Sequence, residues 1–235
     1  MAANPAITLR ARGRARPPRA CAGRRRRSRR SRGRGPRHVE MVDAEIGRVL
    51  QALEDGGHAD DTLVIFIADH GEGTAHHRMT RKNQPCQEAL AVPLVVRLPG
   101  QVPAGRTDDA HLVSGLDVTP TICDYAGVEP PPEMRGRSLR PALEGGNAAW
   151  RDFCVSEVNT NSGRMVRTQR YKYITYAGDE TEQLFDMVQD PGELTNLADD
   201  AGYADVLAAH RRLLGEWESR LDVAPDVPNQ VAWRG

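Results

Sequence analysis

A run of apolar residues from Leu63 to Ala68 stops abruptly at Asp69, His70 and Gly71. The run is rich in β-branched residues and has no polar position, which is typical of a strand covered on both faces in a parallel α/β sheet. Ligands of open α/β sheets bind just beyond the carboxyl ends of the strands. The sequence therefore predicts a central strand that delivers Asp69 and His70 to a candidate site.

The residues around this strand predict an α/β unit. Apolar residues recur at helical spacing from Val39 to Leu53, and Gly56 and Gly57 end that helix. Residues 92–100 predict a second covered strand. Residues 117–127 predict a short helix with Thr119 as its N-cap and Gly127 as its C-terminal stop. We expect an open, mixed or parallel sheet with flanking helices, followed by a Pro- and Gly-rich surface passage over residues 129–146.

The pattern changes in the last third of the chain. Residues 164–176 alternate and are rich in β-formers, so they predict a strand of an antiparallel sheet, and residues 182–187 predict a second one. Pro191 and Gly192 mark a tight turn. Apolar residues from Tyr203 to Leu221 predict a final helix. We therefore divide the chain into an arm (1–38), the α/β part (39–150) and a small α+β subdomain with an antiparallel sheet and a helix (151–235).

The arm differs sharply from the rest in charge. Of 32 basic residues in the chain, 14 are arginines within residues 1–38, which hold no acidic and no aromatic residue. The arm therefore carries +14 and the remainder −14, because the 32 basic and 32 acidic residues cancel overall. We expect the arm to be disordered. Three interpretations stay open, of which we favour the first: out-of-frame translation of GC-rich DNA, a solvated tail, or a segment that binds polyanions such as nucleic acid.

The polar residues after the first strand predict ester chemistry. A carboxylate beside an imidazole, as in Asp69 and His70, suits a divalent cation. His77 follows seven residues after His70, and Lys82 follows five residues later. A cation, a proton donor and a fixed ammonium together suit a tetrahedral anion, so the site is suited to phosphate or sulfate esters. Taken singly, each residue could also be an ordinary turn or surface residue, and His76 could be purely exposed.

Four segments in order resemble the carboxyl-side half of the sulfatase family, in the alkaline phosphatase-like superfamily. They are VEMVDAEIGRVLQALEDGG, VIFIADHGE…HHRMTRK…EALAVPLVV, LVSGLDVTPTICDYAGVEPP…MRGRSLRPALEG and VRTQRYKYI…EQLFDMVQDPGELTNLADD. Together they span about residues 39 to 222. The resemblance implies a metal-assisted hydrolase of sulfate esters, with a sulfated small molecule or glycan as substrate.

The resemblance also implies roles for individual residues. Asp69 and His70 match metal ligands, with Ca²⁺ the usual ion and Mg²⁺ an alternative. Lys82 matches the lysine that holds the sulfate, and His77 matches an active-site histidine that donates a proton to the leaving oxygen. Asp117 also matches a family position, which we interpret as structural. The last helix and its sheet match a small subdomain that helps to form the substrate cleft.

One part of the family pattern is missing from the sequence. Sulfatases use a formylglycine made from a Cys or Ser in a C-x-P-S-R-like motif, together with an early pair of acidic metal ligands. The segment CAGRR, Cys21 to Arg25, has Gly and Arg where Pro and Ser belong, so we treat it as coincidence. Without an activated nucleophile a covalent sulfate-transfer mechanism fails. We therefore expect a truncated sulfatase that is inactive and poorly stable as an isolated chain.

The sequence also leaves open alternative functions and gives expectations for the cysteines and the location. A phosphodiesterase or phosphonate hydrolase of the same superfamily is the alternative activity, and a non-catalytic remnant whose arm binds polyanions is the alternative from another class. The four cysteines are widely spread and predict ordinary thiols rather than disulfides or a zinc ribbon. No secretory signal or membrane-spanning run is visible, so we expect a cytoplasmic location by default and no membrane partner. The oligomeric state leaves no trace in the sequence.

Overall fold

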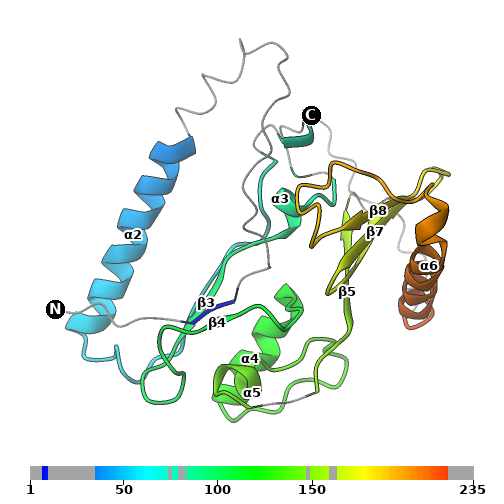
Figure 1. The fold of residues 1–235 in the computed structure, drawn as a ribbon. Helices are drawn as coiled ribbons and strands as arrows, with labels where there is room; N and C mark the ends of the chain where they lie inside the picture. Colours follow the sequence, from blue (N-terminus) through cyan, green and yellow to red (C-terminus); the bar gives the residue numbers. More distant parts are fainter. Residues whose placement is uncertain are drawn as a thin grey trace, which may run out of the picture. The chain divides into compact units, whose positions relative to one another are not determined.

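A computed structural model describes residues 7–9, 35–73, 76–78, 82, 84–146, 149–158 and 163–221. The chain divides into two compact units, Met1–Asp152 and Phe153–Gly235. Figure 1 gives the elements of each unit. This division falls two residues after the domain boundary expected between residues 150 and 151.

The first unit contains a four-stranded mixed sheet in the order β2-β3-β1-β4. Strand β3 pairs antiparallel with both β2 and β1, whereas β1 pairs parallel with β4. A mixed sheet was expected, but the parallel relation of the first two predicted strands was wrong. Parallel neighbours need a long crossover, usually a helix, and the described part of the link from β2 to β3 holds only two very short helices. The strands of this sheet are β1 Ile7–Leu9, β2 Val64–Ile67, β3 Leu94–Arg97 and β4 Thr107–Asp108.

Strand β1 corrects the expectation that all of residues 1–38 are disordered. Residues 7–9 pair with β3, in register with residues 94–96, and with residues 107 and 108 of β4. The triplet Ile-Thr-Leu has two β-branched residues and no arginine, so it suits a strand better than its neighbours do. Residues 35–38 also belong to a helix. The rest of the arm, including Cys21, lies outside the described residues.

Among the described residues, β2 lies at the edge of this sheet, whereas a central strand was predicted. Its third residue, Phe66, is 41% exposed, so one position of the apolar run is not covered within the described residues. A central strand and an edge strand can both have a continuous apolar run, because the sequence pattern depends on residue type and not on which strands lie beside it. The sequence alone therefore could not distinguish the two.

The helices of the first unit follow the predicted pattern with corrected ends. The first predicted helix and the short helix after residue 117 both form, and Gly57 and Gly127 end them with φ of 74° and 67°. The predicted N-cap Thr119 was wrong, because Ser114 and Asp117 form a capping box one turn earlier. The helices are α2 Gly35–Asp55, a 3₁₀ turn His76–Arg78, α3 Gln87–Leu90, a 3₁₀ turn Gly115–Asp117, α4 Val118–Tyr125 and α5 Arg140–Leu143.

The core of the first unit lies between the sheet and the segment that follows α4. Leu139 and Leu143 are almost fully buried and pack in one cluster with β3, although residues 129–146 were expected to form a surface passage. The two leucines are one helical turn apart, which is the spacing of a buried helix face. The prolines and glycines around them led to the expectation of a surface loop instead. The buried members of this cluster are Leu94, Val96, Leu98, Val102, Leu139 and Leu143.

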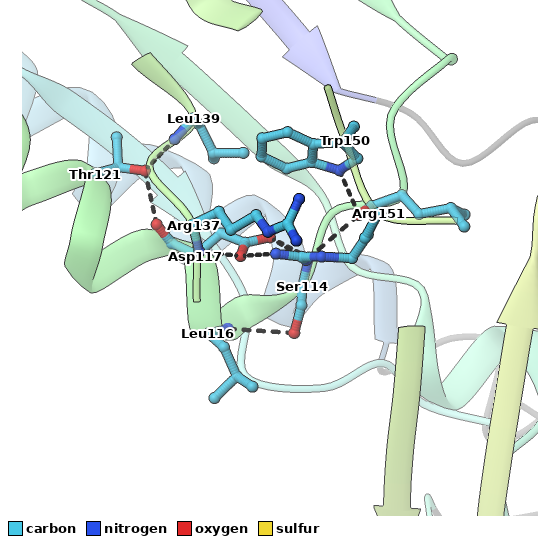
Figure 2. A network of polar contacts seen from close by, with 9 residues as sticks. Ser114, Leu116, Asp117, Thr121, Arg137, Leu139, Trp150 and Arg151 are labelled. Atoms are coloured by element: carbon cyan, nitrogen blue, oxygen red, sulfur yellow. Dashed lines mark hydrogen bonds and ion pairs between the residues drawn. The ribbon is translucent and has the colours of Figure 1, made fainter. Parts of the chain in front are cut away.

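A buried polar network ties this segment to α4 (Figure 2). The fully buried Asp117 carboxylate accepts hydrogen bonds from the backbone N–H of Ser114 and of Arg137, each at 2.8 Å. The guanidinium of Arg151 donates two more, at 2.6 Å from Nη1 and 2.5 Å from Nη2. The Thr121 hydroxyl donates to the carbonyl of Asp117 and accepts from Leu139 N–H. These contacts support the structural interpretation of Asp117.

The second unit is a four-stranded antiparallel sheet in the order β5-β6-β7-β8, followed by one long helix. The single strand predicted over residues 164–176 is in fact a hairpin, because Gln169 and Arg170 form a two-residue turn between β6 and β7. That turn contains none of the Gly, Asn or Asp residues that usually mark it. The elements are β5 Phe153–Val158, β6 Gly163–Thr168, β7 Tyr171–Tyr176, β8 Gln183–Asp186, a 3₁₀ turn Ala201–Tyr203 and α6 Ala204–Glu218.

Helix α6 covers this sheet with the predicted apolar face and contacts β5, β6 and β7 (Figure 1). Leu207 and Leu214 pack in one cluster with Val166, Tyr173 and Leu184 of the sheet. Beneath the loop that follows β8, the Nζ of Lys172 lies 2.5 Å from Glu193 Oε1, and both side chains are almost fully buried. Among the described helices, none is both long enough and apolar enough to cross a membrane.

Candidate functional site

The chain turns sharply after β2 and places His70 in a fixed orientation. Its ring Nδ1 lies 2.7 Å from the carbonyl oxygen of Gly71, and its backbone N–H donates to Asp69 Oδ1 at 2.9 Å. A carbonyl can only accept, so Nδ1 carries the proton in neutral His70 and Nε2 keeps its lone pair. This Nε2 lies 3.4 Å from Asp69 Oδ2. The two groups therefore offer an imidazole nitrogen and a carboxylate on one side of the loop.

Lys82 joins this pair although it lies twelve residues further along the chain. Its Nζ is hydrogen-bonded to His70 Nε2. The Asp69 side chain is 85% exposed, so its carboxylate is open to solvent. We call Asp69, His70 and Lys82 the strand-end cluster. The structure thus brings together three of the four residues singled out in the sequence.

The fourth residue, His77, belongs to a second group beside the first. Its Nε2 lies 3.9 Å from Glu88 Oε2, and its side chain is 21% exposed. The neighbouring His76 is exposed, as the sequence allowed, and its Nδ1 lies 3.0 Å from Glu88 Oε1. We call His76, His77 and Glu88 the Glu88 cluster.

The backbone at His77 is unusual. Its φ of 49° and ψ of 25° lie in the left-handed region, which residues other than glycine rarely adopt. Such conformations cost of order 1–3 kcal/mol and gather at functional sites, where the surrounding structure holds them. The conformation therefore marks His77 as a position where side-chain placement is maintained at some cost.

Sequence reasoning missed Glu88. Its Oε2 is buried and has no hydrogen-bond partner among the described residues. The residue stands at the start of the short helix α3, where an acidic side chain is common. Only the tertiary contact with the two histidines distinguishes it from an ordinary first-turn glutamate.

Gly71 places the two clusters side by side. Its N–H donates to the carbonyl of Ala89 at 2.8 Å, so the loop after β2 lies against α3. A Cβ at this position would lie 1.9 Å from the carbonyl oxygen of Glu88, which leaves no room for any other residue. The closeness of the strand-end cluster to the Glu88 cluster therefore depends on a glycine here.

The strand-end cluster fits two ligand positions of a divalent cation. The exposed Asp69 carboxylate is a hard oxygen donor, and the hydrogen bond at His70 Nδ1 orients the ring and leaves Nε2 available as a ligand. Lys82 Nζ is hydrogen-bonded to that nitrogen in this structure. None of the described cysteines, Cys86, Cys123 and Cys154, stands in a C-x-P-S-R-like motif, so the described residues do not fit a formylglycine.

Two family models match the chain. The model for sulfatases matches residues 14–128, and the model for the C-terminal part of N-sulphoglucosamine sulphohydrolase matches residues 75–219. The second match covers more than half of the chain. The chain therefore belongs to the sulfatase family, in the alkaline phosphatase-like superfamily, as the resemblance implied.

Several characterised proteins are similar to the chain. It is 39% identical over 193 residues to a Δ4,5-hexuronate-2-O-sulfatase of Bacteroides thetaiotaomicron, covering 78% of this chain and 40% of that protein. A protein solved in complex with its substrate D-glucosamine-2-N,6-O-disulfate is 32% identical, with a TM-score of 0.72 over 77% of this chain and 39% of the other. The phosphonate monoester hydrolase of Agrobacterium radiobacter is 35% identical, with a TM-score of 0.69 over 77% and 40%. The chain thus spans about 40% of the length of these relatives.

Proposed function

We propose that this chain supplies one side of the active site of a sulfuric ester hydrolase. Asp69 and His70 hold a divalent cation, Lys82 binds the sulfate, and His77 donates a proton to the leaving oxygen. The observation that carries the proposal is the convergence of Asp69, His70 and Lys82 at the end of β2, in a chain that belongs to the sulfatase family.

Each side chain has a role that its chemistry can perform. When bound, a cation supplies charge that polarises the sulfate oxygens. The Lys82 ammonium attracts another oxygen of the same group and opposes the negative charge that develops there. A protonated His77 transfers its proton to the ester oxygen while a nucleophile from outside the described residues bonds to the sulfur and the alcohol leaves.

The proposed cation is Ca²⁺, with Mg²⁺ as the competitor. Ca²⁺ accepts irregular oxygen-rich coordination, whereas Mg²⁺ demands near-octahedral geometry and gives up water reluctantly. An open, solvent-exposed carboxylate such as Asp69 suits the more adaptable ion. A titration of the chain with each ion by calorimetry, for the natural protein and for Asp69→Ala, tests this choice: Ca²⁺ binding should be tighter and should be lost in the variant.

A sulfated sugar is the proposed substrate class. One relative of this chain is named as a Δ4,5-hexuronate-2-O-sulfatase, and another was solved in complex with its substrate D-glucosamine-2-N,6-O-disulfate. A phosphonate or phosphate ester is the second candidate, favoured by the likeness to a phosphonate monoester hydrolase.

A chimaera tests the proposed activity directly. Residues 39–221 would replace the aligned segment of the Bacteroides thetaiotaomicron 2-O-sulfatase, and initial rates would be measured on an aryl sulfate and an aryl phosphonate. We expect sulfate hydrolysis that falls at least a hundredfold in Asp69→Ala and Lys82→Ala, in keeping with the loss of one charge-stabilising group. A folded chimaera whose sulfatase rate is unchanged by both substitutions would refute the proposal. Faster phosphonate than sulfate hydrolysis would favour the second candidate.

A further inference from the structure

The Glu88 cluster and Cys86 form a donor set unlike that of the strand-end cluster. A donor nitrogen of His77 and the Sγ of Cys86 lie within 4.8 Å of one another. The same histidine lies 3.9 Å from Glu88 Oε2, and His76 Nδ1 lies 3.0 Å from the other oxygen of that carboxylate. Two imidazoles, a thiol and a carboxylate thus gather around the start of α3.

These distances are close to those around a four-coordinate zinc ion. Zn²⁺ binds sulfur at about 2.3 Å and imidazole nitrogen at about 2.0–2.1 Å, so two such ligands lie about 3.5 Å apart across a tetrahedral ion. The carboxylate already lies near that spacing from both histidines. The Cys86 sulfur lies within 4.8 Å of a His77 nitrogen, so it needs to approach by at most about 1.3 Å.

The unsatisfied oxygen of Glu88 is an independent sign that this place suits a cation. Glu88 Oε2 is buried and accepts no hydrogen bond from the described residues. A buried carboxylate oxygen without a partner costs roughly 1–3 kcal/mol or more. A metal ion held between Glu88 and His77 would supply that partner.

The two clusters differ in the ions that they suit. Carboxylate and water ligands favour hard ions such as Ca²⁺ and Mg²⁺, whereas thiolate and imidazole ligands favour zinc and related transition metals. Because of Cys86, the Glu88 cluster should prefer zinc-like ions, whereas Asp69 should prefer Ca²⁺ or Mg²⁺. The thiol must lose its proton to solvent when it binds the metal, so binding should weaken at acid pH.

We infer that His76, His77, Cys86 and Glu88 form a second metal site, specific for zinc-like ions. The regulatory consequence rests on the function proposed above: a zinc ion that occupies the Nε2 of His77 removes the proton donor, so zinc inhibits ester hydrolysis. Zinc binding itself needs no such assumption. A sulfatase with this site would hydrolyse esters in the presence of Ca²⁺ and would be inhibited by excess Zn²⁺.

Cobalt provides the test, because Co²⁺ takes zinc sites and reports its ligands in the absorption spectrum. Adding Co²⁺ to the full chain in the presence of excess Ca²⁺ should give a sulfur-to-cobalt charge-transfer band and intense visible bands of tetrahedral cobalt. One equivalent of Zn²⁺ should abolish them. Cys86→Ser should remove the charge-transfer band, and Glu88→Gln should weaken binding by about tenfold or more.

Two matched controls make the result decisive. Cys123→Ser changes another half-buried cysteine away from the site and should leave the spectrum intact. Asp69→Ala should also leave it intact, which separates this site from the strand-end cluster even if the proposed function fails. Circular dichroism checks that each variant is folded. Absence of the charge-transfer band in the folded natural chain, or its persistence in Cys86→Ser, would overturn the inference.

Discussion

Arg151 forms a bidentate ion pair with Asp117, which lies 34 residues earlier in the sequence. The Asp117 carboxylate is fully buried. The same carboxylate also accepts the backbone N–H groups of Ser114 and Arg137 (Figure 2). All four hydrogen bonds converge on one side chain, which ties the start of α4 to the segments after it. Removing this group leaves a largely buried guanidinium and two backbone donors without their acceptor.

We therefore expect Asp117→Ala to destabilise the chain by about 3–5 kcal/mol, because breaking a buried ion pair leaves an uncompensated charge. Chemical unfolding followed by tryptophan fluorescence measures this change. Asp124→Ala is the matched control, since Asp124 pairs with Arg140 in a half-exposed position and should cost about 1 kcal/mol or less. Equal losses of unfolding free energy in the two variants would show that the buried ion pair stabilises the chain no more than the half-exposed one.

Gly71→Ala should uncouple the loop after β2 from α3. The new methyl group would lie 1.9 Å from the carbonyl oxygen of Glu88, so the loop must move. We expect a loss of more than about 2 kcal/mol in unfolding free energy, as for overpacked positions, together with weaker cation binding. Gly47→Ala in α2 is the control: nothing lies within 4 Å of its Cβ, and alanine should stabilise that helix by up to about 1 kcal/mol. A Gly71→Ala chain as stable as the natural one would contradict the structure.

The pair Lys172 and Glu193 should show strong coupling. Either substitution alone, Lys172→Met or Glu193→Gln, leaves a buried charge and should cost about 3–5 kcal/mol. The double variant removes both charges, so its loss should be smaller than the sum of the single losses. A double-mutant cycle by urea denaturation measures the interaction energy. Simple additivity would mean that the two groups do not stabilise one another.

His210 should make stability fall in weak acid. Burial against the sheet lowers the pKa of this histidine below its usual 6.5, although its Nδ1 lies 2.7 Å from the Val206 carbonyl. As the pH falls through 6.5, the unfolded chain therefore gains a proton that the folded chain still refuses. The contribution is fully present above that pH and is lost progressively below it.

Urea denaturation from about pH 8 to about pH 5 tests this dependence. The slope of stability against pH should flatten in His210→Gln, which keeps a polar group near Thr168 but cannot take up the proton. His58→Gln is the control, because the His58 side chain is well exposed. A slope that is unchanged in His210→Gln but reduced in His58→Gln would reverse the assignment.

Local patterns in the sequence predicted most elements of the fold. Helix α4 and its stop at Gly127, the final helix and the apolar runs of β2 and β3 all follow from residue type and spacing. The antiparallel pairing of β2 and β3 could not be predicted from residue type and spacing, because it depends on how the intervening chain returns to the sheet. The hairpin at Gln169 was hidden for a related reason: its turn uses side chains without a turn preference.

The site was predictable to a similar degree. Asp69, His70 and Lys82 could be selected by their place after an apolar run, and the structure brings them together. Glu88 could not, since its partners His76 and His77 reach it only after Gly71 packs on α3. The left-handed backbone of His77 could not be located from its residue type alone, although histidine adopts this region more often than most residues. Positions defined by contact rather than by local sequence therefore need the fold.

The strand order of the second sheet has a consequence for how the chain folds. In β5-β6-β7-β8 each strand pairs with its neighbour in sequence, whereas in the first sheet Ile7 must find Val96. Sheets built from local pairings form faster, because less chain entropy is lost before the first contacts stabilise them. We expect the second unit to acquire protection from hydrogen exchange first, even though a ribosome releases it last. The first unit would then mature late, with its strand-end cluster assembled among the final events.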